Sequence, residues 1–182
     1  MLHEASTSRS TPAAASKATP RARRRDANLG RILDAAARLV ADEGLDALSM
    51  ARLADAVDYT PGALYRYVDS KDALLSLLVQ RILDDLRGAL AAAVTSPMGA
   101  LERLVAMVRA YRAFVAGAPH RFGVLAIALA TPRVLLASPA HGEPATAAVV
   151  ATLRPIADAL AAAVTAGELG PGDPVERTLT LF

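Results

Sequence analysis

Residues 60–75 read TPGALYRYVDSKDALL, and two helix starts stand within them. Thr60 is a capping residue followed by Pro61, and proline is tolerated at the first helical position because its missing N–H would be unpaired there in any case. Ser70 is a second capping residue, and a long aliphatic run follows it. The stretch therefore predicts a helix of about two turns, over 61–67, and then a much longer helix over about 71–94.

Two more helices are predicted upstream of this stretch. The first covers about 27–43, where aliphatic residues recur on one face and Gly44 supplies the stop. Ser49 caps a short helix that ends near Val57. The turn that follows needs a residue tolerant of positive φ, and Asp58 can supply it because its short side chain bonds locally.

Downstream, start signals predict helices near Pro97, Pro119, Glu143 and Pro174. Pro155 is expected to kink the seventh helix, since the apolar period resumes after it. Alternating β-branched or aromatic runs are nearly absent, so the prediction is an all-α fold. The last helix, with the apolar residues Leu179, Leu181 and Phe182, is expected to be cut short at the C-terminus, or to leave apolar residues for a partner to cover.

The composition excludes several classes of protein. The chain has no cysteine, which rules out disulfides and thiolate chemistry. The longest stretch without Asp, Glu, Lys or Arg is the 14 residues 88–101, too short to span a bilayer, which needs roughly 20 apolar residues. The N-terminus has no apolar segment typical of a secretory signal. A cytoplasmic protein without a membrane partner is expected.

Positive charge is concentrated at the N-terminus. Residues 1–25 hold six basic side chains against one acidic side chain, giving +5, whereas the remaining 157 residues hold 14 basic and 17 acidic, giving −3. Residues 1–25 have no apolar period and are predicted to be a disordered basic tail. Such a tail either attracts a polyanion or only keeps the chain solvated.

The helix–turn–helix over 49–67 can place its second helix in a DNA major groove. Thr60 and its helix N-terminus could bind phosphate, Gly62 would allow close approach of the backbone, and Ala63 could touch a thymine methyl. Tyr65, Arg66, Tyr67 and Lys71 could add phosphate or base contacts. The alternative is an ordinary amphipathic helix in a purely structural partner protein, although such a helix has no need for an exposed glycine, which costs about 1 kcal/mol against alanine.

Residues 31–86 resemble the N-terminal domain of the tetracycline-repressor (TetR) family of bacterial transcription regulators. The matching segments are EGLDALSM, LADAV, PGALYRYV and SKDALL. Two departures stand out: the turn that usually reads Gly-Val-Ser is 58–60, Asp-Tyr-Thr, and Val68 replaces a common phenylalanine.

The resemblance implies a helix-turn-helix DNA-binding domain over 26–70 and an incomplete helical effector-binding and dimerisation domain over 71–182. It implies a homodimer that binds a near-palindromic double-stranded operator, most simply a repressor released by a small effector. The basic arm gains weight as a ligand of DNA phosphates or the minor groove. The implied DNA-contacting residues are Ser49, Thr60, Pro61, Gly62, Ala63, Tyr65, Arg66, Tyr67 and Lys71, with Arg23, Arg24 and Arg25 in the arm.

Two further expectations concern chemistry in the C-terminal half. Four large side chains could bound a cavity for a mostly apolar effector, the alternative being an ordinary packed core: Met107, Tyr111, Phe114 and Phe122. His3 lies in the tail, and His120 and His141 lack carboxylates at metal-ligand or relay spacing. There is no HExxH, glycine-rich phosphate loop or GxSxG motif. No enzymatic activity, metal or cofactor is therefore expected.

Overall fold

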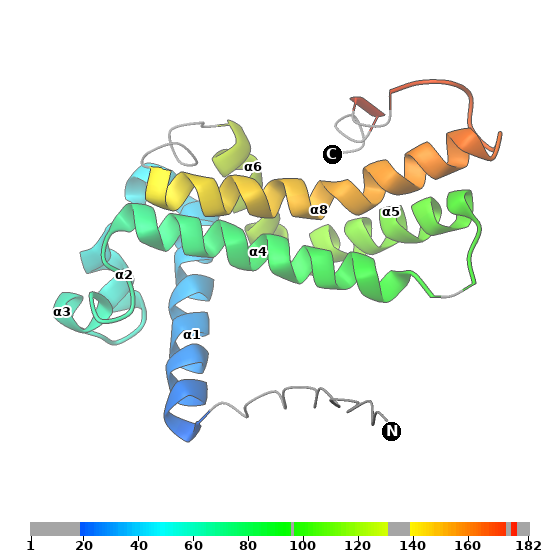
Figure 1. The fold of residues 1–182 in the computed structure, drawn as a ribbon. Coiled ribbons are helices and arrows are strands. Elements are labelled where there is room, and N and C mark those ends of the chain that lie inside the picture. Colours follow the sequence, from blue (N-terminus) through cyan, green and yellow to red (C-terminus); the bar gives the residue numbers. More distant parts are fainter. Residues whose placement is uncertain (1–18, 96, 131–138, 174–175, 178–182) are drawn as a thin grey trace, which may run out of the picture.

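The computed structural model describes residues 19–95, 97–130, 139–173 and 176–177, with only the backbone described at 128–130 and 139–142. Every regular element in these ranges is helical, so the all-α prediction is confirmed (Figure 1). The elements are α1 (Pro20–Glu43), the 3-10 helix η1 (Leu45–Ala47), α2 (Met50–Ala56), α3 (Pro61–Leu64), α4 (Lys71–Ala93), α5 (Ala100–Gly117), α6 (Pro119–Ala130) and α8 (Pro139–Thr165).

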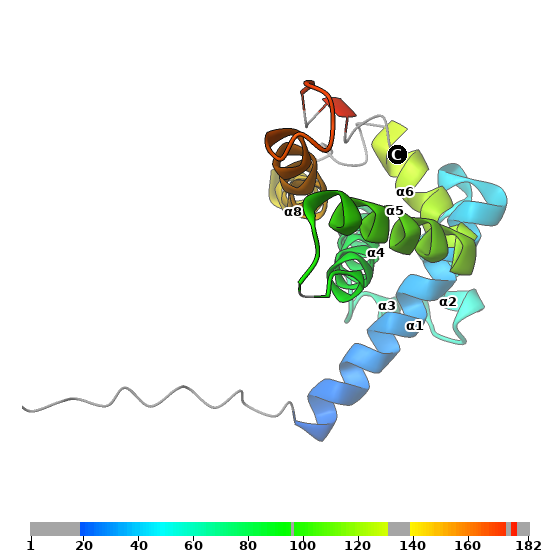
Figure 2. The ribbon, with the colours of Figure 1, turned by 90° about the vertical axis from the view of Figure 1, so that its right-hand side faces the viewer.

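The long helices form two groups in space. Helices α4, α5 and α8 pack side by side, and α1 crosses them at one end, where it contacts α6 (Figure 1). The short helices α2 and α3 lie against α1 and the start of α4. The first turns of α1 reach away from the other helices (Figure 2).

The start of α1 differs from the prediction. The helix begins at Pro20 and not near Ala27, so the part of the basic arm over 20–25 is helical and the expected disordered tail is wrong there. The reason is the Thr19-Pro20 pair, in which the Thr19 hydroxyl accepts a hydrogen bond from the Ala22 N–H at 3.2 Å. Residues 1–18 lie outside the described residues.

The capping residues of the helix–turn–helix are confirmed. The hydroxyls of Ser49, Thr60 and Ser70 each accept a hydrogen bond from a backbone N–H three residues on, at 3.0–3.2 Å. Gly44 ends α1 with φ of 85°, and Asp58 has φ of 58°, the one non-glycine residue with positive φ in the described part of the chain. These short side-chain contacts set the helix ends from local sequence.

Helix α3 is shorter than predicted. It ends at Leu64, and residues 65–67 continue as a tightened turn, in which the Tyr67 N–H donates to the Leu64 carbonyl at 2.8 Å. This three-residue spacing replaces the four-residue spacing of an α-helix and turns the chain toward Ser70.

Other helix starts are corrected as well. Helix α5 begins at Ala100 and not at Pro97, because the Glu102 carboxylate accepts from the Gly99 N–H at 3.1 Å. Helix α8 begins at Pro139, earlier than expected, and continues through Pro155. The predicted start of α6 at Pro119 is confirmed.

Asp173 lies just before the last predicted helix, which is expected to begin at Pro174. The Asp173 carboxylate accepts from the Glu176 N–H at 2.9 Å, as a cap would. The rest of the helix expected from Pro174, with Leu179, Leu181 and Phe182, lies outside the described residues.

Two hydrophobic clusters fill the interior. The first joins α1, α2 and α3 to the first half of α4, up to Leu83, and takes Val124, Leu125 and Ala145 from α6 and α8. The second contains residues of α4, α5 and α8: Leu86, Leu90, Leu104, Met107, Ile156, Ala159 and Leu160. Packing is therefore continuous across residue 70, the predicted domain boundary, and that division remains a prediction.

Arg121 of α6 links α1 to α4. Its guanidinium contacts Asp34 of α1 and Asp85 of α4, both at 2.9 Å, and the arginine side chain is only 27% exposed. Arg81 adds a second contact to Asp85 at 3.2 Å. One guanidinium thus neutralises carboxylates from both sides of the predicted boundary.

By length and composition, residues 143–165 of α8 would be sufficient to cross a membrane. Several of them are buried in the protein, among them Thr152 and Ile156. The Thr152 hydroxyl donates to the carbonyls of Ala148 and Leu83, at 2.8 and 3.4 Å. These contacts are those of a helix packed in a protein core.

Candidate nucleic-acid interface

Helices α2 and α3 present one face to the core and the other to solvent. Leu53 of α2 and Leu64 of α3 are fully buried, and Val68 is buried beside them. On the opposite side, Tyr65 is 50% exposed, and a Cβ added to Gly62 would meet nothing within 4 Å. The inward residues therefore hold α3 firmly, while its outer face is open.

The predicted DNA-contacting residues differ in their exposure. Ser49, Thr60, Pro61, Gly62, Tyr65, Arg66, Arg23, Arg24 and Arg25 are exposed, whereas Ala63, Tyr67 and Lys71 are half-buried. Lys71 is the first residue of α4, and its ammonium donates to the Leu45 carbonyl of η1 at 3.0 Å, which holds the side chain against η1. Ser49 and Thr60 accept backbone hydrogen bonds, and their own hydroxyl protons stay available to an acceptor.

Tyr67 is held by residues far away in the sequence. Its ring stacks on Tyr59, with centroids 6.1 Å apart and planes 22° apart. Its hydroxyl accepts from the Asn28 amide at 3.2 Å, and the Arg25 guanidinium lies 6.0 Å from its ring centre. Arg25 also donates to the Arg66 carbonyl at 3.5 Å. Asn28, which lies one turn after Arg25 on α1, is not among the residues predicted from the sequence. The Thr19-Pro20 helix start is the signal that indicates its place on the helix.

Two tyrosines hold their protons more tightly than free tyrosine. Burial raises the pKa of Tyr59 above its ordinary value of 10.0, and its side-chain hydrogen bond with Tyr67 raises it further, against the lowering effect of Arg31 and Arg66. Burial also raises the pKa of Tyr111. In both cases the folded state favours the neutral phenol.

Absorbance titration of the phenols should show these raised pKa values. The chain has four tyrosines and no tryptophan, so phenolate absorbance is easily resolved. We expect Tyr59→Phe and Tyr111→Phe each to remove one ionisation above pH 10. Because the folded-state pKa is raised, the stabilisation from each phenol is fully present below pH 10 and is lost as pH rises through the raised pKa. Unchanged high-pH titration in both variants would contradict the assignment.

One segment in the N-terminal half of this chain matches a known family model. Residues 32–78 match the family model of bacterial regulatory proteins, tetR family. This segment of the chain is similar to the TetR family of bacterial regulatory proteins. This agrees with the resemblance of residues 31–86 noted in the sequence.

Two individual proteins show further similarity to this chain. Over 77 residues, 42% of this chain, the sequence is 36% identical to the HTH-type transcriptional repressor KstR2 of Rhodococcus jostii (strain RHA1). The match spans only 38% of that relative. A bacterial regulatory protein of the tetR family from Rhodococcus RHA1 superposes with a TM-score of 0.74 at 25% identity, over 85% of this chain and 78% of that one.

A third comparison shows the fold alone. The structure of AibR in complex with isovaleryl coenzyme A and operator DNA superposes with a TM-score of 0.72 at 23% identity, covering 85% of this chain and 81% of that one. The described helices of this chain therefore share the overall fold of that structure.

Three of the four residues predicted to line an effector cavity, Met107, Tyr111 and Phe114, lie in or against the second cluster, and Phe122 contacts one of them. Met107 is buried in the second cluster, and Phe114 packs against both clusters. Tyr111 and Phe122 meet edge to face, with centroids 6.3 Å apart. Their present arrangement is that of a packed core, so the effector site remains a prediction.

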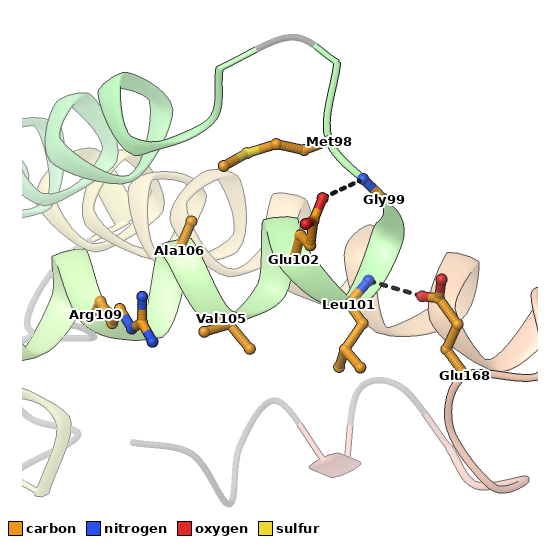
Figure 3. A pocket seen from close by; sticks show the side chains of 8 residues that line it. All are labelled: Met98, Gly99, Leu101, Glu102, Val105, Ala106, Arg109 and Glu168. Atoms are coloured by element: carbon orange, nitrogen blue, oxygen red, sulfur yellow. Dashed lines mark hydrogen bonds between the residues drawn. The ribbon is translucent and has the colours of Figure 1, made fainter.

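A pocket of about 800 Å³ lies elsewhere, beside the start of α5 (Figure 3). Leu101 and Val105 are exposed there, with Arg109 at one end. The Glu168 carboxylate accepts from the Leu101 N–H at 2.9 Å (Figure 3). The pocket is lined by Met98, Gly99, Leu101, Glu102, Val105, Ala106, Arg109 and Glu168 and includes none of the four predicted effector residues.

Proposed function

We propose that this chain is a sequence-specific DNA-binding transcription regulator that uses α3 and the adjoining turn as its recognition element. The observation that carries the proposal is the two-sided character of α3. Leu64 is fully buried while Gly62 and Tyr65, on the other side, face open space. A glycine with no neighbour within 4 Å is not required by the chain's own packing, and close approach of a DNA backbone gives it a reason.

Phosphate contacts would surround this recognition element. The hydroxyls of Ser49 and Thr60 can donate to phosphate oxygens while they cap their helices. Arg66 is exposed and can reach a base edge or a phosphate, and Tyr65 offers a hydroxyl on a rigid ring. Pro61 and Ala63 would lie against the groove, and Lys71 would contribute charge from its place beside η1.

We further propose a homodimer that acts as a repressor in the cytoplasm. Two recognition elements about 34–36 Å apart would fit successive major grooves of a near-palindromic operator. The similarity to the TetR family and the names of the relatives support this, and the KstR2 relative is named a transcriptional repressor.

A small, mostly apolar effector would release the operator. The site we propose is formed by Met107, Tyr111, Phe114 and Phe122, whose edge-to-face and cluster contacts would open to admit it. Phe114 packs against both clusters, so its displacement would change the packing of the first cluster, which contains residues of α1 and α4. The structural neighbour AibR, solved with isovaleryl coenzyme A and operator DNA, supports a ligand-responsive regulator.

Selection of genomic DNA fragments by the purified chain tests the DNA-binding proposal. We expect one or a few fragments to be retained, with footprinting to reveal a protected inverted repeat and affinity to fall steeply with salt. Retention of all fragments alike would contradict sequence-specific recognition. Protection of a single half-site would contradict the proposed dimer but not sequence-specific DNA binding.

A thermal-shift screen of small apolar compounds tests the effector proposal. A compound at about 100 times its dissociation constant should stabilise the fold by about 2.7 kcal/mol. We expect Phe122→Leu to change the affinity of a stabilising compound, whereas Val105→Ala, in the exposed pocket beside α5, leaves it unchanged. The reverse pattern would move the effector site to that pocket.

A further inference from the structure

The recognition element is held at its far end by α1. Helix α3 has only four residues, and residues 65–67 continue it as a turn whose N–H groups bond back to carbonyls of residues 61–64. Arg25 reaches the Arg66 carbonyl and the Tyr67 ring, and Asn28 donates to the Tyr67 hydroxyl. The pose of this turn thus depends on contacts that span about forty residues of sequence, at separations of 41 and 39.

The same contacts anchor the first turns of α1. The buried residues of α1 begin at Ile32, so residues 20–28 lie beyond the hydrophobic core. In the described part of the chain, the side-chain hydrogen bonds and ring contacts of residues 20–28 go to Arg66 and Tyr67. The projecting end of α1 and the recognition turn therefore order each other.

Neighbouring arginines of the arm differ in this respect. Arg24 is exposed and makes none of these contacts, whereas the Arg25 guanidinium is directed at the recognition turn. A planar guanidinium can lie over a ring and bond a carbonyl at once, a geometry that an ammonium does not reproduce.

We propose that Arg25 and Asn28 are positioning residues, which hold Tyr67 and the Arg66 backbone in the pose that reads DNA. This inference rests on the proposed function, and it revises the expectation that Arg25 is a phosphate ligand. Loss of one such hydrogen bond should weaken operator binding roughly two- to tenfold.

A charge-preserving pair of substitutions separates positioning from simple electrostatics. We expect Arg25→Lys to weaken binding to the selected operator fragment roughly two- to tenfold, with an unchanged slope of log affinity against log salt. The matched control is Arg38→Lys, an exposed arginine of α1 outside the arm and the recognition element, and it should leave affinity within about twofold. Equal affinity of both variants and the parent chain would overturn the role of Arg25, since charge alone would then suffice.

A double-mutant cycle tests Asn28. If Asn28 acts through the Tyr67 hydroxyl, Asn28→Ala weakens operator binding in the parent chain and has little further effect in the Tyr67→Phe background. An equal loss in both backgrounds would overturn the proposal, because Asn28 would then be acting directly on DNA.

A measurement on the protein without DNA tests the positioning role of Asn28 independently of the DNA-binding proposal. Near-UV circular dichroism reports fixed aromatic packing, and here tyrosine and phenylalanine give the signal because the chain has no tryptophan. We expect Asn28→Ala to reduce the tyrosine band while far-UV dichroism stays unchanged. Reduction of that band in a chain that binds no fragment specifically would support positioning and refute the DNA-binding proposal. An unchanged band would overturn positioning, whatever the DNA result.

Discussion

Replacing Leu64 by alanine is expected to lower the free energy of unfolding by about 2–5 kcal/mol and to abolish sequence-specific DNA binding. Leu64 is the one buried residue of α3 and is fully enclosed in the first hydrophobic cluster. Its removal costs both transfer free energy and a cavity, and it also frees the recognition element from its support. Urea unfolding followed by far-UV circular dichroism measures the first effect, and fragment retention measures the second.

The next residue provides the matched control. Tyr65 is half exposed on the outer face, so Tyr65→Ala should change the free energy of unfolding by no more than about 0.5 kcal/mol while it weakens DNA binding. Equal destabilisation by Leu64→Ala and Tyr65→Ala would contradict the two-sided description of α3.

Neutralising three exposed arginines in the first turns of α1 is expected to cause the second large loss of DNA affinity. In the triple variant Arg21→Gln, Arg23→Gln, Arg24→Gln, three phosphate contacts would be lost, each worth about 0.9 in the slope of log affinity against log salt. At about 0.1 M salt this corresponds to a loss on the order of several hundredfold, alike for all DNA sequences. The three residues are exposed, so the free energy of unfolding should barely change. A salt titration of DNA affinity measures the slope.

Exposed arginines on the far helices test whether net charge alone explains such a loss. Arg109, Arg112 and Arg154 lie on α5 and α8 and are exposed. The corresponding triple glutamine variant has the same net charge as the arm variant, and we expect it to keep the parent slope. Matching slopes in the two triple variants would show that the arm makes no phosphate contacts.

Local signals made much of the fold predictable. Ser49, Thr60 and Ser70 each bond a backbone N–H three residues away, so nothing distant in the sequence is needed to place those helix starts. The positive φ at Asp58 follows from equally local chemistry. The exposed face of the recognition element was predictable for the same reason, because it follows from which residues of a short helix point inward.

The errors had two sources. Thr19-Pro20 is the same start signal as Thr60-Pro61. The arginines that follow it have no apolar period, and that pattern is typical of a disordered tail. Contacts between distant residues could not be read from sequence at all. The Asn28–Tyr67 hydrogen bond and the Arg121–Asp34 ion pair join residues 39 and 87 positions apart, and their existence depends on how whole helices pack.

The continuous first cluster also decides where this chain can be divided to make chimaeric regulators. A cut at residue 70 would strip α1, α2 and α3 of Leu74, Leu78 and Ile82, each of which contributes about 1.5–3 kcal/mol by its burial. A junction inside α4, between Leu83 and Leu86, falls where one cluster ends and the other begins. A foreign sensor fused there would still have to supply substitutes for Val124, Leu125 and Ala145. The packing unit that carries the recognition element therefore ends in the middle of a helix. Transferring it to another protein means transferring the first half of α4 as well.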